Sequence, residues 1–254
     1  MTGQRIHLLG APLDLLSMAQ TVARAEDAMA SGRRLQQVVI NVAKLVNMRT
    51  DADLRQDVLD SDIINIDGTG ILWAARLLGH RVEERVAGID LMEALIAACA
   101  RHGYKPYFLG ASEAVLEQAM AKLRADHPAL QIAGYRNGYF GTEEEAQVVA
   151  DISNSGAHCL FVAISSPTKE RFLRQHRDQL GVPFLMGVGG ALDVVAGQVR
   201  RAPKWMRHVG LEWLYRLAQE PRRMWRRYLV TNTIFLFLLL GELARTWLSG
   251  KKRQ

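Results

Sequence analysis

The sequence predicts an α/β protein with layers of helices around a largely parallel sheet, followed by a helical C-terminal appendage. Over residues 1–199, short runs that are apolar throughout alternate with longer segments of helical periodicity. Such runs are typical of parallel strands that are buried on both faces. After residue 200 the composition becomes basic and rich in tryptophan. We therefore predict a boundary there, with an α/β body at residues 1–199 and an appendage at residues 200–254.

The elements of the body follow from this alternation. The predicted strands are residues 37–41, 62–66, 106–109, 131–133, 159–164 and 184–188. The predicted helices are residues 15–30, 71–78, 91–101, 114–125, 143–153 and 169–177. In open parallel sheets, ligands bind beyond the carboxyl ends of the strands. Several of the turns that follow the predicted strands are polar or glycine-rich, so we expect the site among them.

Bulk composition places the chain among ordinary globular proteins. Its 254 residues are 49% hydrophobic and 23% charged, without a low-complexity tract. Cys99 and Cys159 stand in separate apolar stretches, a pattern that indicates buried, reduced thiols rather than a disulfide framework. The first 16 residues lack the features of a signal peptide. We therefore expect a cytoplasmic chain.

The net charge of +6 is unevenly distributed. Residues 200–254 hold 13 Lys/Arg against 3 Asp/Glu, whereas residues 1–199 hold 19 against 23. In the appendage, arginines and tryptophans adjoin the apolar run at residues 234–240. This neighbourhood favours a helix that lies in the plane of a membrane interface over a nucleic-acid site.

Three other interpretations of the appendage remain open. The run of seven apolar residues is shorter than the roughly 20 that span a bilayer, and extending it to residues 228–248 adds Glu242 and Arg245. A spanning helix is one alternative, and a buried C-terminal helix is another. An apolar helix away from its membrane also favours contact with a second copy, so a homo-oligomer is the third.

Asp67 is the first candidate site residue. It follows an apolar strand and opens the sequence Asp-Gly-Thr-Gly at residues 67–70. A carboxylate in this place can accept a proton from an attacking hydroxyl, or it can cap the helix that follows. Both interpretations stay open at this point. Further along, Arg85 could hold a phosphate and Asp90 could cap a helix, although such a pair usually forms a surface salt bridge.

A glycine-rich turn gives the second candidate. Residues 187–193 read Gly-Val-Gly-Gly-Ala-Leu-Asp and follow a predicted strand. Glycines let backbone N–H groups approach an anion closely, which predicts a nucleotide-diphosphate site, with a tight structural turn as the alternative. The turn is neither a dinucleotide fingerprint nor a Walker loop. Without a metal-ligand pattern in the sequence, we expect arginines and helix ends, rather than a metal or other cofactor, to neutralise the diphosphate.

Six blocks together resemble the WecG/TagA/CpsF group, which is glycosyltransferase family 26, over nearly the whole chain. The blocks are residues 67–76, 85–91, 108–110, 187–193, 201–205 and 210–216, the last continuing to residues 220–223. The resemblance implies a Rossmann-like fold and metal-independent, inverting transfer from a UDP-sugar to an undecaprenyl-diphosphate-linked sugar. It also implies that the appendage contacts the membrane as a peripheral element at the cytoplasmic face of the bacterial inner membrane.

The resemblance further suggests roles for individual residues. Asp67 corresponds to the general base and Asn41 to a residue that orients substrate. Arg85, Lys169 and the turn with Gly187, Gly189, Gly190 and Asp193 correspond to the donor and nucleotide site. The candidates for binding the diphosphates lie in the appendage and are Arg216, Arg222, Arg223, Arg226 and Arg227.

Two departures from the family pattern fall beside the expected sugar site. Many members carry Gly-x-Pro-x-Gln-Glu where residues 165–170 read Ser-Ser-Pro-Thr-Lys-Glu, and residues 38–40 lack a frequent threonine. We therefore expect a hexose or an N-acetylhexosamine donor, used in surface or exopolysaccharide synthesis. Two other function classes remain: a nucleotide-binding oxidoreductase, which shares the α/β layout, and a non-catalytic membrane adaptor, which needs only the appendage.

Overall fold

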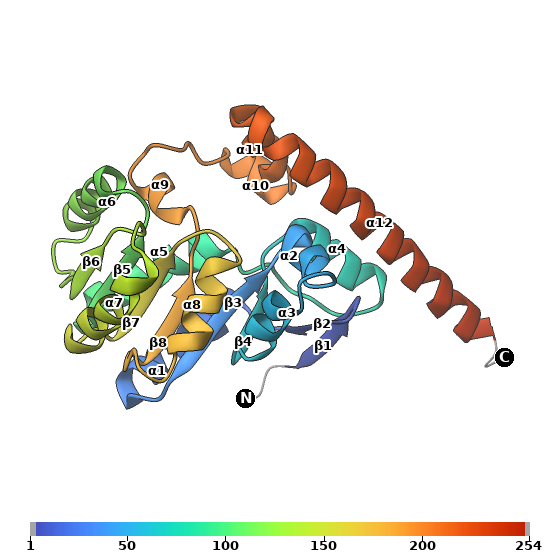
Figure 1. The fold of residues 1–254 in the computed structure, drawn as a ribbon. Coiled ribbons are helices and arrows are strands. Elements are labelled where there is room, and N and C mark those ends of the chain that lie inside the picture. Colours follow the sequence, from blue (N-terminus) through green and yellow to red (C-terminus); the bar gives the residue numbers. More distant parts are fainter. Residues whose placement is uncertain (1–3, 252–254) are drawn as a thin grey trace.

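A computed structural model describes residues 4–251, except for the side chains of His208, Arg223 and residues 249–251. Its centre is a six-stranded, wholly parallel sheet in the order β4-β3-β8-β7-β5-β6 (Figure 1). The strands are β3 (Leu35–Ile40), β4 (Ile63–Ile66), β5 (Pro106–Gly110), β6 (Gly134–Arg136), β7 (Cys159–Ala163) and β8 (Phe184–Gly187). The predicted α/β class with a parallel sheet is confirmed.

Helices cover both faces of the sheet. They are α1 (Met18–Ser31), α2 (Val42–Asn47), α3 (Ala52–Leu59), α4 (Thr69–Leu77), α5 (Gly88–His102), α6 (Glu113–Asp126), α7 (Thr142–Asn154), α8 (Thr168–His176) and α9 (Ala191–Val195). Alternate residues of one strand serve the two faces: Phe161 of β7 packs with α1, α5 and α6, whereas Leu160 packs with α7 and α8. This double burial explains why the central strands are apolar throughout.

One predicted strand is wrong. Residues 131–133 precede β6, which begins at Gly134 and pairs with β5 through Tyr107. A Cβ atom on residue 134 would lie 2.6 Å from the ring of Tyr107, so glycine is required there. As an edge strand that is only partly covered, β6 has no apolar run to indicate its position.

A short hairpin, β1 (Arg5–Leu8) and β2 (Ala11–Asp14), lies beside the sheet and was not predicted from the sequence. Its buried Asp14 accepts a hydrogen bond from the backbone N–H of Ile64 at 2.8 Å and pairs with Arg5 at 2.8 Å. The carboxylate therefore ties the hairpin to β4 and satisfies a donor on that strand.

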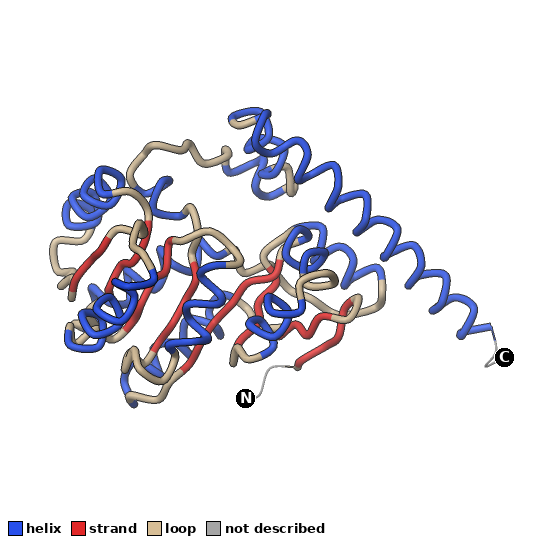
Figure 2. The backbone as a smooth tube through the Cα atoms, viewed as in Figure 1, coloured by secondary structure: helices blue, strands red, loops and turns tan. Residues whose placement is uncertain are grey.

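Three helices form the end of the described chain: α10 (Lys204–His208), α11 (Glu212–Gln219) and α12 (Pro221–Lys251). They lie together at the edge of the body where the strands end, and α12 extends beyond the body toward the C-terminus (Figures 1 and 2). The expected apolar C-terminal helix is thus present. Whether residues 200–254 form a unit of their own stays a prediction.

The middle of α12 is packed onto the body, while most of its apolar surface is not covered. Phe235 and Leu239 join a core cluster with Ile71 and Leu72 of α4. By contrast, Phe237 is 70% exposed. The segment Met224–Leu248 is long and apolar enough to cross a membrane by length and composition, and 11% of its most apolar 18-residue window is buried. An exposed apolar surface of this size is typical of a contact with a membrane or with another protein.

Candidate active site

The predicted turns meet at one edge of the sheet because the strands are parallel. Asn41 follows β3, Asp67 follows β4, and the turn at residues 187–190 follows β8. Strands β4, β3 and β8 are neighbours, so these three turns are neighbours as well. The tan loops in Figure 2 emerge along this edge, which faces α10 and α11.

Asp67 is held at the end of β4 without serving as a helix cap. Its backbone N–H donates to the carbonyl of Ile40 at 3.0 Å, which fixes the residue beside β3. The next helix, α4, has Gly68 as its N-cap, with no side-chain hydrogen bond at the cap. The structure therefore removes the capping explanation that the sequence left open. Burial raises the pKa of Asp67 to about 6, against the opposing charge of Arg85 and with reinforcement from Glu212.

Arg85 lies between the body and the appendage. The segment before α5 crosses the end of β4, where the N–H of Val86 donates to the carbonyl of Ile66 at 2.7 Å. One guanidinium nitrogen of Arg85 is 3.9 Å from the Asp67 carboxylate, and the other is 3.3 Å from the carboxylate of Glu212 on α11. The ordinary surface pair between Arg85 and Asp90 is not formed.

Asp90 has a different role from the one suggested by the sequence. Helix α5 begins at Gly88, with Ala87 as its N-cap, so Asp90 is not the cap. Its carboxylate instead accepts hydrogen bonds from Arg201 and Arg207, which anchor the start of the C-terminal helices to the body.

Asn41 caps a helix, a role that the sequence did not indicate. Its side-chain oxygen accepts a hydrogen bond from the N–H of Lys44 at 3.0 Å and so caps α2. A Cβ atom on Gly68 would lie 3.4 Å from Asn41, so the residue stands directly against the turn that carries Asp67. Its role in orienting substrate stays a prediction.

Two of the three glycines in the 187–190 turn are favoured by their surroundings or by their backbone conformation, and Gly190 is not. A Cβ atom on Gly187 would lie 2.8 Å from the side chain of Lys169, and Gly189 has a positive φ of 54°. At Gly190, a Cβ atom would lie 3.4 Å from the Asp193 carboxylate and 3.9 Å from a guanidinium nitrogen of Arg216. Packing thus accounts for Gly187, whereas Gly190 is where the appendage approaches the turn. The helix that follows, α9, has just five residues and offers a weak dipole.

Lys169 belongs to a buried ionic cluster beneath this turn. Its ammonium lies 3.0 Å from Oε1 of Glu170, and the ammonium of Lys44 lies 2.7 Å from the same oxygen. Burial lowers the pKa of Lys169 to about 8, and Lys44 adds to the lowering. Burial by itself would raise the pKa of Glu170, but the two lysines hold it at about 2. Sequence reasoning missed Lys44, since its partner is 126 residues away.

Glu170→Gln is expected to destabilise the fold by about 3–5 kcal/mol, because it leaves two buried ammonium groups without an anion. The stabilisation from Glu170 is present above its ordinary pKa of 4.5 and is lost as the pH falls from there toward 2. Urea unfolding at pH 7 and pH 3 measures both effects. The matched control is Glu117→Gln on the exposed face of α6, and an equal loss in both variants would contradict the assignment.

The structure separates the arginines predicted to bind diphosphates. Arg216 lies beside Gly190 and is close enough to Asp67 to oppose the rise of its pKa. Arg227 is close enough to contribute to the lowering of the pKa of Lys169. Arg222 and Arg226 are exposed on α12, and the side chain of Arg223 lies outside the described residues. The geometry therefore brings Arg216 to the strand ends, whereas Arg227 is itself exposed and influences Lys169 through its charge.

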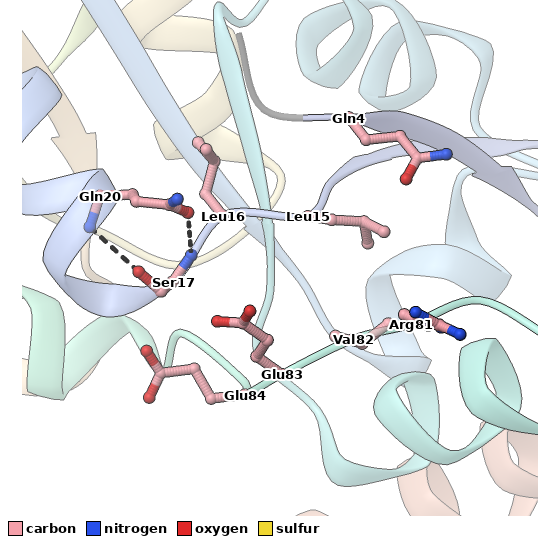
Figure 3. A pocket seen from close by; sticks show the side chains of 9 residues that line it. All are labelled: Gln4, Leu15, Leu16, Ser17, Gln20, Arg81, Val82, Glu83 and Glu84. Atoms are coloured by element: carbon pink, nitrogen blue, oxygen red, sulfur yellow. Dashed lines mark hydrogen bonds between the residues drawn. The ribbon is translucent and has the colours of Figure 1, made fainter. Parts of the chain in front are cut away.

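A separate cavity of about 150 Å³ lies between the β2–α1 connection and residues 81–84 (Figure 3). Its walls include two carboxylates, Glu83 and Glu84, against the single guanidinium of Arg81. That charge is unsuited to a diphosphate, and none of the predicted site residues lines the cavity. Within residues 4–251, no cluster of three or more His, Cys, Asp or Glu side chains could hold a metal. Metal independence stays a prediction.

Comparisons with known proteins find the family that the sequence blocks resemble. The family model described as "Glycosyl transferase WecG/TagA/CpsF family" matches residues 6–249. The N-acetylglucosaminyldiphosphoundecaprenol N-acetyl-beta-D-mannosaminyltransferase of Bacillus subtilis (strain 168) is 32% identical over 192 residues. That alignment covers 76% of this chain and 74% of the relative. The chain therefore belongs to the WecG/TagA/CpsF family of glycosyl transferases.

Proposed function

We propose that this glycosyl transferase moves a hexose or N-acetylhexosamine from a UDP-sugar to a sugar linked to undecaprenyl diphosphate. The observation that carries the proposal is the position of Asp67. Its carboxylate has a raised pKa and does not cap a helix. It lies at the end of a strand, near Arg85 of the body and Arg216 of the appendage. Family membership decides against the oxidoreductase and the adaptor.

Asp67 has the properties that a general base needs for this transfer. With a pKa of about 6, it is ionised at neutral pH and still basic enough to accept a proton. The acceptor hydroxyl attacks the anomeric carbon and gives its proton to Asp67. The bond between that carbon and the UDP oxygen breaks, and UDP leaves with the electron pair. A single displacement of this kind inverts the anomeric configuration.

Cations on both sides of the site support a diphosphate leaving group. Arg85 of the body lies 3.9 Å from Asp67, and Arg216 of α11 lies beside Gly190 of the turn at residues 187–190. Guanidinium groups bind phosphate oxygens through charge-assisted hydrogen bonds. In this proposal they stabilise the developing charge on UDP, so that no metal is needed.

Two observations support a lipid-linked acceptor: the name of the relative and the exposed apolar surface of α12. The relative's name describes an acceptor with a diphosphoundecaprenol group, which is a membrane lipid. Because Phe235 and Leu239 are packed in the body core, the middle of α12 is held against α2 and α4. A helix held in this way is better placed to lie on the cytoplasmic surface of the inner membrane than to cross it. Its exposed apolar residues then enter the interface.

The test is UDP release from a panel of UDP-hexoses and UDP-N-acetylhexosamines, with and without a lipid-diphosphate-linked N-acetylglucosamine acceptor, in the presence of EDTA. We expect acceptor-dependent release with at least one donor. Absence of release with every donor, whether metal ions are present or chelated, would contradict the proposal. Release that needs an added metal would refute its metal-independent form.

Arg216→Ala is expected to reduce kcat/KM by at least about tenfold, because a hydrogen bond to a charged group contributes roughly 1.5–3 kcal/mol. Arg222→Ala, on the exposed surface of α12, serves as the matched control, and we expect a change of less than about threefold. Initial rates with a detergent-solubilised acceptor make the comparison independent of membrane binding. Equal losses in the two variants would contradict the placement of Arg216 at the site.

A further inference from the structure

Glu212 is an acidic residue of α11 that reaches the body at the candidate site. Its Oε2 atom accepts a hydrogen bond from Nη2 of Arg85 at 3.3 Å. The same nitrogen lies 3.5 Å from the carbonyl oxygen of Arg207 in α10. The appendage thus holds one end of the Arg85 guanidinium by two acceptors.

The other end of that guanidinium faces Asp67 at a greater distance. Nη1 of Arg85 is 3.9 Å from Oδ1 of Asp67, which is within ion-pair range but too long for a hydrogen bond. A guanidinium can grip one carboxylate with two parallel N–H donors. If Arg85 were released from Glu212, its guanidinium could form such a bidentate pair with Asp67. The carboxylate oxygens of Asp67 would then be occupied and could not accept the proton.

We propose that Glu212 is a positioning residue that keeps Asp67 available as the base, because it holds Arg85 toward the appendage and presents a negative charge to the site. This inference rests on the proposed function. In this proposal Asp67 can act as the base only when α11 is docked on the body, since both conditions depend on the contact between Glu212 and Arg85. A body without its docked appendage would leave Arg85 free to pair with Asp67.

The charges around Asp67 support the same direction of effect. Burial raises its pKa to about 6, three cations oppose the rise, and Glu212 reinforces it. The cations are Arg85 before α5, Lys44 on α2 and Arg216 on α11. Without the charge of Glu212 the cations act unopposed, so the pKa of Asp67 is expected to fall.

The experiment is the pH dependence of kcat/KM for wild type and Glu212→Gln on the donor and acceptor pair found active in the panel. We expect the acidic limb of the variant to move down by about half a pH unit or more, and its plateau rate to fall because the base is weaker. Glu242→Gln on α12, whose partner is Arg245, is the matched control and should keep the wild-type midpoint.

A second variant keeps the test decisive if Glu212→Gln folds poorly. Glu212→Asp retains the charge but has a shorter reach, so its acidic limb is expected between those of wild type and Glu212→Gln. If the acidic limbs of both Glu212 variants coincide with that of wild type, the inference is overturned while the proposed function stands. If wild type turns over no donor, it is the proposed function that fails.

Discussion

Asp67→Asn is expected to reduce kcat by at least about 10²–10⁴-fold, the usual contribution of general acid–base catalysis. Asparagine keeps the shape of the side chain but cannot accept the proton of the attacking hydroxyl. For the wild type, activity should fall as the pH drops through about 6, where the Asp67 carboxylate becomes protonated. Steady-state rates between pH 5 and 8 test both statements.

Stability provides the control for this variant. The folded-state pKa of Asp67 lies above its ordinary value of 3.8, so the folded chain loses stability from this group as the pH rises from about 4 to 6. Asp67→Asn removes that cost and is expected to leave the free energy of unfolding at pH 7 equal or higher. Asp126→Asn, on the exposed end of α6, should change neither property. Near-normal turnover in Asp67→Asn would exclude Asp67 as the base.

Removal of residues 200–254 is expected to abolish both recovery with membranes and activity. The deletion takes away Arg216 and Glu212, which face the strand ends, together with the apolar surface of α12. Membrane flotation and acceptor-dependent UDP release measure the two losses. Full activity of the shortened chain on a lipid-linked acceptor would contradict the role given to the appendage.

A pair of substitutions on α12 separates membrane contact from folding. Phe235 is 8% exposed and Phe237 is 70% exposed, although they are two residues apart. Phe237→Ser is expected to weaken binding to anionic vesicles without lowering the melting temperature. Phe235→Ser should lower stability by about 3–5 kcal/mol, the usual cost of truncating a buried phenylalanine. Unchanged vesicle binding of Phe237→Ser would argue against an interfacial helix.

The sequence predicted the parallel sheet, and it predicted that the polar turns after its strands would gather at one edge, because both depend on local patterns. Central strands are apolar throughout, and the turns that follow them are recognisable from glycine and polar residues. The hairpin β1–β2 gave no such pattern, since its four-residue strands contain Pro12 and a buried Asp14. Asp14 is explained by its contacts with Arg5 and Ile64, which lie outside its own strand.

Long-range charge contacts could not be predicted in the same way. A lysine on a short helix is expected at the surface. Lys44 is buried because α8 packs nearby in the folded chain and brings Glu170 to it. Glu212 stands within the block at residues 210–216, yet its importance depends on Arg85, which is 127 positions earlier in the chain. The same holds for the arginines of the appendage, which look equivalent in the sequence. The folded structure places Arg216 beside Gly190 and leaves Arg222 exposed.

The most direct test of the account is the anomeric configuration of the linkage formed from an α-configured UDP-sugar, read from the one-bond carbon–hydrogen coupling of the product. Direct attack by an acceptor hydroxyl that gives its proton to Asp67 predicts a β-linked product. An α-linked product would mean that the configuration is retained, which a single backside displacement assisted by Asp67 cannot give, and it would contradict this mechanism.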